Sequence, residues 1–283
     1  MNRLNQIWKD LSVSWPAAMI AGLPVNRSRV LMDGSRRCRI KTRCWHSRLM
    51  IAAGNGIYRI WGVPFRILTG AEWAKREELI HYRLYGEDVR RDKQGQLILP
   101  MKDGIDLADL LGSPVIPWDA KREALKDALQ ALARLHDLAG EGAPFSHGDA
   151  IVSNVVCLPS DRAACWVDFE TVHISNLSSL QRQADDIRAF VMSAARYLPA
   201  GRLKELFDLA GGVYQTPALW EQVRYSLMDL NYGRTVVYAA QAKMRYAQWI
   251  ETRSAVLRLL EEKTCALSGR DWSLPAGARL AGE

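Results

Sequence analysis

The sequence lacks a run of about eighteen apolar residues, so a helix that spans a membrane is not expected. Its five cysteines have neither metal-ligand nor redox spacing, and they are expected to be free thiols in a reducing compartment. A basic residue, Arg3, stands near the start, but Lys9 and Asp10 interrupt what would be the apolar region of a signal peptide. These absences predict a cytoplasmic location.

The excess of positive charge is confined to one part of the chain. The net charge is +7, yet residues 1–48 alone contain ten Lys or Arg against two Asp, a balance of +8. Such a segment could attract a phosphorylated glycolipid, the inner face of a membrane or nucleic acid, or it could be a solvated strand face. Nucleic acid is the least favoured partner because no aromatic platform is interleaved with the arginines. Residues 4–11 have amphipathic helical spacing and could lie on a membrane or cover the core.

Oxygen-bearing side chains gather between residues 147 and 170. Asp149 and Asn154 stand in a short polar loop, and two apolar runs then lead to Asp168 and Glu170. If the two runs pair as a hairpin, Asn154 and Asp168 return to the same place on neighbouring strands. Such a cluster suits Mg²⁺ held by one or two carboxylates together with a phosphate, and it leaves one acid to orient an attacking hydroxyl.

The spacing of these residues resembles a known family. His147-x-Asp149-(x)4-Asn154 followed by Asp168-Phe169-Glu170 resembles the catalytic loop and metal-binding segment of the protein-kinase-like phosphotransferases. Residues 125–136 resemble the helix that precedes this loop. Gly148 and Glu170 favour the small-molecule branch, which includes aminoglycoside phosphotransferases, choline kinases and lipopolysaccharide core sugar kinases.

The resemblance implies an α+β, bilobal protein-kinase-like fold. The N-terminal lobe, residues 1–102, is expected to be a small antiparallel sheet with one helix that covers the nucleotide. The C-terminal lobe, residues 103–283, is expected to be mainly helical and to carry the acceptor site. ATP and Mg²⁺ are the implied cofactors. The implied catalytic residues are Asp149, Asn154 and Asp168, and the implied metal ligands are Asn154, Asp168 and Glu170.

The first part of the N-terminal lobe has the pattern of strands from residue 28 to 61. Asp33-Gly34 is a strong two-residue hairpin signal, and Gly54-Asn55-Gly56 is a second one. Either turn could cover the phosphates, although neither has the full G-x-G-x-x-G pattern. The segment therefore predicts a meander of strands.

A helix from residue 69 or 70 to about 85 contains Glu77, which resembles the glutamate that pairs with a strand lysine in active kinases. No lysine stands at the usual distance before it. Arg59 falls near that position and is one candidate for the role, and Lys41 is the other. A Glu77 on the helix surface with no role in the site is the alternative.

Residues 97–104 resemble the last strand and the hinge between the lobes, where the backbone of Met101 or Lys102 would bind adenine. Asp186 resembles the aspartate that supports the catalytic loop, although a pair of acids at a helix N-terminus would also explain it. Further helices are expected over residues 119–139, 202–210, 217–230 and 234–262, followed by a loose tail from residue 268.

We expect transfer of the ATP γ-phosphate to a hydroxyl of a sugar or glycolipid acceptor at the inner membrane face. Aminoglycoside or choline-type kinase activity is the nearest alternative within the family. A protein Ser/Thr kinase would share the same core residues. A pseudokinase that acts as a binding module is suggested by the incomplete glycine loop and the missing lysine.

Overall fold

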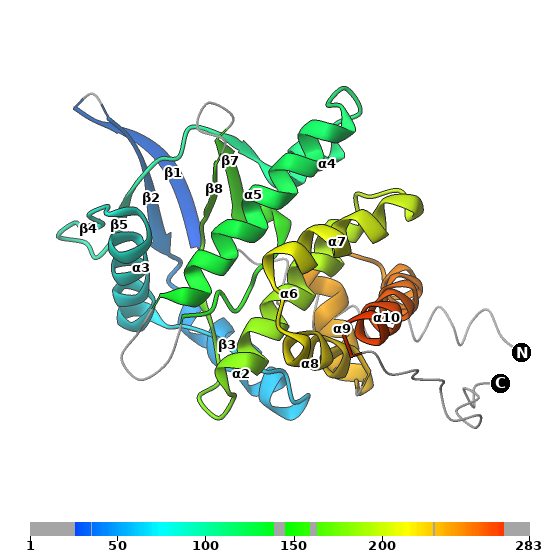
Figure 1. The fold of residues 1–283 in the computed structure, drawn as a ribbon. Helices are drawn as coiled ribbons and strands as arrows, with labels where there is room; N and C mark the ends of the chain where they lie inside the picture. The colour runs from blue at the N-terminus through cyan, green and yellow to red at the C-terminus, as the bar shows by residue number, and fades with distance from the viewer. Residues whose placement is uncertain (1–25, 35, 139–144, 159–162, 229, 269–283) are drawn as a thin grey trace, which may run out of the picture.

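The computed structural model describes residues 26–34, 36–138, 145–158, 163–228 and 230–268. The amphipathic segment 4–11 and the tail beyond residue 268 lie outside these ranges. Figure 1 shows the sheet and helix α3 on one side of the molecule and helices α6 to α10 gathered on the other.

A four-stranded antiparallel sheet forms the N-terminal part, in the order β1-β2-β5-β4. Its strands are β1 (Asn26–Asp33), β2 (Arg36–Arg43), β4 (Arg90–Arg91) and β5 (Leu97–Pro100). The predicted hairpin at Asp33-Gly34 is confirmed, since Asp33 pairs with Arg36 and Gly34 has a φ of +62°. The two-residue alternation along β2 buries Cys38 and Ile40. Lys41 lies seven residues after Gly34, and coverage of the phosphates by this turn stays a prediction.

Helix α3 (Gly70–Tyr85) packs on this sheet, as the sequence predicts. Trp73 and Ala74 of the helix form a small core with Leu97 and Leu99 of β5. The helix ends at Gly86, whose φ of +65° is a conformation that glycine adopts at little cost. Packing of an apolar face therefore fixes α3 against β5.

The second hairpin predicted in this part is wrong. Residues Ser47–Ile60 form helix α2, and Phe65–Ile67 form the short strand β3. The apolar runs that suggested two strands also fit a helical period, because Ser47, Ile51 and Gly54 all face inward at spacings of three and four. Asn55 is not a turn residue: its side chain accepts from the Ile67 amide at 2.8 Å and donates to the Ile67 carbonyl at 2.9 Å. The N-terminal part thus has a second helix.

The C-terminal part is mainly helical. Its helices are α4 (Leu107–Gly112), α5 (Trp118–Asp137), α6 (Ser179–Ala195), α7 (Leu203–Val213), α8 (Pro217–Met228), α9 (Tyr232–Gln241) and α10 (Tyr246–Ser268). The long helix predicted over residues 234–262 is divided into α9 and α10. The break contains Lys243, whose φ of +54° is incompatible with a continuous right-handed helix.

Short strands connect this helical part to the functional segment. Strands β7 (Val155–Leu158) and β8 (Ala163–Trp166) form the predicted antiparallel hairpin, and β6 (Ile105–Asp106) pairs with β7. Strand β9 (Thr171–His173) pairs with β3. The main core, in which Trp166 and Phe190 are fully buried, extends from α5 through α6 to α8.

The predicted α+β fold class is confirmed, since an antiparallel sheet with its helix precedes a larger helical part. The boundary near residue 102 stays a prediction. Over the described ranges, no helix has the length and apolar character needed to cross a membrane.

Candidate active site

Lys41 lies between two carboxylates that come from distant parts of the chain. Its Nζ is 2.8 Å from Glu77 Oε1 on α3 and 3.0 Å from Asp168 Oδ1 beyond β8. The side chain of Lys41 is 8% exposed and that of Glu77 is fully buried. Burial favours the neutral amine, but Asp168 and Glu77 outweigh it and raise the pKa of Lys41. Lys41 and Glu77 are therefore both charged at neutral pH.

The alternative candidate for this position, Arg59, does not reach the site. It lies exposed on α2, because the segment that was expected to be a strand is a helix. Lys41 stands on β2, earlier in the chain than the expected spacing, and still meets Glu77. The prediction of Arg59 as a nucleotide-binding residue is thus wrong, and Lys41 is the basic residue that the structure places beside Asp168.

Asp168 has a backbone conformation that is uncommon for a residue with a side chain. Its φ is +71°, in the left-handed region. The carboxylate is 38% exposed, and it lines the same pocket as Asp149 and Asn154. Non-glycine residues in this region concentrate at functional sites, where surrounding structure holds them. Here the turn after β8 directs the carboxylate toward Lys41.

The loop before Asp149 is held from below by Asp186 of α6. Asp186 accepts hydrogen bonds from the backbone amides of His147 at 2.6 Å and Gly148 at 2.8 Å, and it contacts His136 Nε2 at 3.0 Å. This is the supporting contact that the sequence led us to expect. Burial lowers the pKa of His147 to about 4, so its ring is neutral at physiological pH.

Gly148 is required by both conformation and space. Its φ is +82°, and a Cβ atom there would stand 2.9 Å from the backbone of Thr171. This close approach brings the loop against the strand that follows Asp168. A side chain at position 148 would separate Asp149 from the Asp168 segment.

Asp149 is held by two amide side chains. Asn154 Nδ2 donates to Asp149 Oδ2 at 3.0 Å, and Gln241 Nε2 on α9 donates to Oδ1 at 2.9 Å. Burial raises the pKa of Asp149, whereas the hydrogen bond from Gln241 lowers it. Because the amide nitrogen of Asn154 is used by Asp149, its oxygen is the atom left for another ligand. The loop thus presents a carboxylate and an amide oxygen together.

Glu170 forms an ion pair with Arg43, a residue that no sequence pattern indicated. Its Oε2 is 2.9 Å from Arg43 Nη1 and also accepts a hydrogen bond from Asn26. Burial raises the pKa of Glu170 to about 7, and the Asp168 charge adds to the rise. Both contacts use the same oxygen, so a metal would have to bind Glu170 through Oε1. Glu170 is therefore a weaker candidate ligand than Asn154 or Asp168.

The expected hinge is narrow. The Met101 amide donates to the Arg37 carbonyl at 3.0 Å, and Lys102 forms an ion pair with Glu87 and lies 4.4 Å from the Tyr85 ring centre. A small cavity of about 30 Å³ remains beside Met101 and Lys102. The Met101 amide is thus already used in this conformation, and adenine binding by the backbone of Met101 or Lys102 stays a prediction. The Lys102 amide or the Met101 carbonyl would have to serve, after the hinge side opens.

A larger cavity, of about 510 Å³, lies beside Asp149 and Asp168. Its walls are helices α2 and α9 together with the turns after β8 and before η1 (Val152–Asn154). Its lining residues are Asn26, Met50, Ile51, Ile57, Tyr58, Trp61, Phe65, Ile67, Asp149, Ile151, Ser153, Asn154, Asp168, Glu170, Thr171, Val237, Ala240, Gln241 and Lys243. Three of the carboxylates predicted from sequence, with Asn154, therefore face one cavity.

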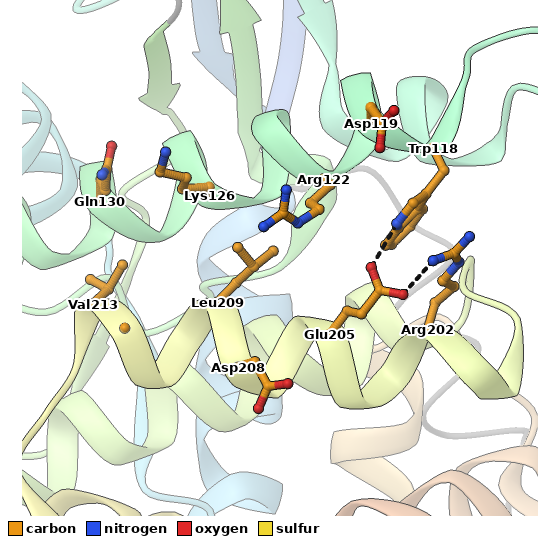
Figure 2. A pocket seen from close by; sticks show the side chains of 11 residues that line it. Trp118, Asp119, Arg122, Lys126, Gln130, Arg202, Glu205, Asp208, Leu209 and Val213 are labelled. Atoms are coloured by element: carbon orange, nitrogen blue, oxygen red, sulfur yellow. Dashed lines mark hydrogen bonds and ion pairs between the residues drawn. The ribbon is translucent and has the colours of Figure 1, made fainter.

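Another cavity, of about 640 Å³, lies between α5 and α7 and is shown in Figure 2. Trp118 and Glu205 are joined there by a hydrogen bond of 2.8 Å, and Arg202 lies over the Trp118 ring. None of the site residues predicted from sequence lines it. It is separate from the candidate active site.

Several residues that build the site were missed from the sequence. Arg188 of α6 donates to Asp185 and, at 2.9 Å, to Gln241 Oε1, and it stacks 3.4 Å from the ring centre of Tyr238. Since a guanidinium can only donate, this contact fixes the Gln241 amide with its nitrogen toward Asp149. The one signal in the sequence was Asp185 and Arg188 at helical spacing; nothing linked them to Gln241.

The oxygen donors fit a hard cation in part. Among the described residues, no group of three His, Cys, Asp or Glu side chains is arranged to hold a metal ion. Mg²⁺ is commonly bound by one or two carboxylates while phosphate and water complete the octahedron. Asp168 and the Asn154 amide oxygen meet that requirement. They are the residues that would hold Mg²⁺ here.

No protein-family model and no curated protein sequence matches the chain. Similar solved structures include a Ralstonia eutropha JMP134 protein described as a candidate aminoglycoside phosphotransferase, which has 11% identity and a TM-score of 0.33 over 93% of this chain and 98% of that one. They also include a Plasmodium vivax ethanolamine kinase, with 10% identity and a TM-score of 0.39 over 90% of this chain and 87% of that one. These likenesses concern the fold alone.

Proposed function

We propose that the chain is an ATP- and Mg²⁺-dependent phosphotransferase that moves the γ-phosphate to a hydroxyl of a sugar or glycolipid. The observation that carries the proposal is the ion triplet of Lys41, Glu77 and Asp168, because Asp168 also lines the cavity that Asp149 and Asn154 line. A cation held by a buried carboxylate beside a second carboxylate suits a metal-bound phosphate chain. The amide-held Asp149 suits an incoming hydroxyl.

The residues then have separate roles. Asp149 would orient the acceptor hydroxyl and take its proton as the acceptor oxygen bonds to the γ-phosphorus and the bond to ADP breaks. Lys41 would bind phosphate oxygens, with Glu77 holding its ammonium in place. Asn154 and Asp168 would hold Mg²⁺, which supplies neutralisation of the phosphate charge when bound. The hinge side, where Lys102 forms an ion pair with Glu87, must open to admit the adenine of ATP.

The glycolipid part of the proposal draws on the charge of the first strands. Arg27, Arg29 and Arg37 are exposed on the β1-β2 hairpin, and so are Val30 and Met32, which are 53% and 57% exposed. Basic and apolar side chains together favour an anionic membrane surface. An acceptor embedded in the inner membrane face would be within reach of a protein held there.

The test is phosphate transfer from labelled ATP in the presence of Mg²⁺ to a panel of glycolipids and amino sugars. We expect labelled glycolipid with the wild type and a loss of about a thousandfold with Asp149→Ala. Control samples of Asp137→Ala, a substitution on α5 that does not line the cavity, should retain activity. A turnover near the wild-type value with Asp149→Ala would remove Asp149 from the mechanism.

One observation favours a second candidate, a pseudokinase that binds a partner and no nucleotide. The cavity beside the hinge has a volume of about 30 Å³, and the Met101 amide is already used. The two candidates differ in their response to ATP. A phosphotransferase is stabilised by ATP only when Mg²⁺ is present, whereas a pseudokinase of this kind is not stabilised.

A further inference from the structure

The lining of the 510 Å³ cavity combines two kinds of chemistry. Asp149, Asn154, Asp168 and Glu170 form its transfer end. Apolar and aromatic side chains from α2, from the residue after it and from α9 form a second part of the lining, which we call the wall. If the proposed function holds, the wall contacts the part of the acceptor that does not react.

The carboxylates of the cavity are all engaged at the transfer end. Asp168 pairs with Lys41 at 3.0 Å, and Glu170 pairs with Arg43 at 2.9 Å. Asp149 is held by Asn154 and Gln241. Among the described residues that line the cavity, no other Asp or Glu is present. A cationic group of an acceptor would therefore find no carboxylate of its own.

The wall is apolar and aromatic. It is formed by Met50, Ile57, Tyr58 and Trp61 of α2 and the residue after it, facing Val237 of α9. The end of α2 is fixed to α9, because Asn231 donates to the Trp61 carbonyl at 3.0 Å. Close packing there depends on a glycine: a Cβ atom on Gly233 would stand 2.3 Å from the Trp61 ring. This wall is thus an anchored part of the fold.

A cation stands at the rim of the cavity. Lys243, in the break between α9 and α10, donates to Ser153 Oγ of the catalytic loop at 2.9 Å. Its φ of +54° is unfavourable for a lysine. This charge repels an ammonium group and attracts an anionic one. The apolar wall and the Lys243 charge together disfavour the binding of an amino sugar.

We propose that the acceptor is an alcohol with an apolar portion and no cationic group, whose hydroxyl reaches Asp149 while its apolar portion lies against Ile57, Tyr58 and Trp61. This inference rests on the proposed function for the role of the hydroxyl. Contact with the wall can be measured as binding, without turnover. A polycationic amino sugar would leave its charges desolvated against α2 and close to Lys243, which costs binding free energy.

The experiment measures binding of three probes by calorimetry, each below its micelle concentration. The probes are octyl glucoside, methyl glucoside and the octyl glycoside of glucosamine. We expect octyl glucoside to bind about tenfold or more tightly than methyl glucoside, because the octyl chain buries apolar area on the wall. The amine-bearing probe should bind about tenfold more weakly than octyl glucoside.

Two isoleucines of α2 provide a matched pair of variants. Ile57 lines the cavity, whereas Ile60 is 80% exposed and does not line it. Ile57→Glu should weaken octyl glucoside binding about tenfold, and Ile60→Glu should leave it unchanged. Circular dichroism and thermal melting establish that both variants are folded. A second pair tests the cation: Lys243→Glu should remove the preference against the amine, and Arg245→Glu, at an exposed position two residues away, should keep it.

The proposal is overturned by equal binding of octyl and methyl glucosides, by tighter binding of the amine, or by equal effects of Ile57→Glu and Ile60→Glu. Absence of saturable octyl glucoside binding overturns it as well. The proposed phosphotransferase function has a separate test. An absence of Mg²⁺-dependent ATP binding in the same preparations would overturn that function. Binding of octyl glucoside without ATP binding would support the apolar acceptor site and overturn the proposed phosphotransferase reaction.

Discussion

The side-chain amide of Gln241 donates a hydrogen bond of 2.9 Å to the carboxylate of Asp149, although the two residues are 92 positions apart in the sequence. Arg188 fixes the direction of that amide by donating to its oxygen at 2.9 Å. A buried arginine of α6 thus reaches Asp149 through a glutamine of α9. Gln241 is a positioning residue for the proposed base.

We predict that Gln241→Leu lowers kcat about a hundredfold, because Asp149 loses a bond that sets its orientation. The lost hydrogen bond also raises the pKa of Asp149 further. The acidic limb of the pH–rate profile should consequently move to higher pH. The measurement is kcat across pH for the variant and for Gln215→Leu, an exposed glutamine used as the control. An unshifted profile would reduce Gln241 to a packing residue.

Lys41→Met should abolish transfer and also destabilise the fold, because Glu77 would be left buried without its ion pair. Breaking a buried pair from one side costs about 3 kcal/mol. Arg59→Met, at an exposed position, should change the unfolding free energy by less than about 0.5 kcal/mol and leave activity intact. Chemical denaturation measures the stability of the two variants, and ATP turnover measures their activity. Equal effects of the two substitutions would mean that the Lys41–Glu77 pair is not the functional one.

Stability should depend on pH through Glu77, whose pKa is lowered from 4.5 to about 2: burial raises it, but Lys41 and His81 more than offset that effect. A lowered pKa means that the folded state binds the proton less well than the unfolded chain. Its contribution is therefore present above pH 4.5 and is lost as pH falls toward 2. We predict a loss of about 3 kcal/mol over this window. Urea titrations of Glu77→Gln should show that part of the pH dependence removed.

Alanine substitutions at two glycines with positive φ distinguish the destabilisation caused by backbone strain from that caused by steric contact. Gly148→Ala should destabilise the fold by about 3 kcal/mol, since the new Cβ would meet the Thr171 backbone as well as adopt an unfavourable φ. Gly34→Ala introduces backbone strain alone, because no atom lies within 4 Å of the new Cβ atom. It should lower the free energy of unfolding by about 1 kcal/mol. Thermal unfolding of both variants measures the difference. Equal losses would show that the close approach at Gly148 can relax.

The sequence was most informative where residues of one site are close in the chain. Asp149, Asn154 and Asp168 were expected to lie close together, and they line one cavity because a loop and a hairpin bring them together within twenty residues. Their catalytic roles stay a prediction. The segment 47–60 was misread because short apolar runs fit a strand and a helix equally well. Its helical state is decided by tertiary contacts, such as those of Asn55 with Ile67.

The pairing of Lys41 with Glu77 could not be chosen over Arg59 while residues 47–60 were taken for strands. Predicting strands where the chain forms helix α2 changes which side chain is expected to point toward α3. Gln241 and Arg188 could not be identified either, since their roles exist only after α6 and α9 pack together. Long-range contacts between polar side chains leave no periodic pattern in a sequence.

The most direct measurement of the central claim is the melting temperature with ATP, with and without Mg²⁺, for the wild type and for Asp168→Ala. If Lys41, Asn154 and Asp168 bind a metal-bound triphosphate, ATP with Mg²⁺ should raise the melting temperature of the wild type only. No rise with the wild type, or an equal rise without Mg²⁺ or in Asp168→Ala, would contradict it.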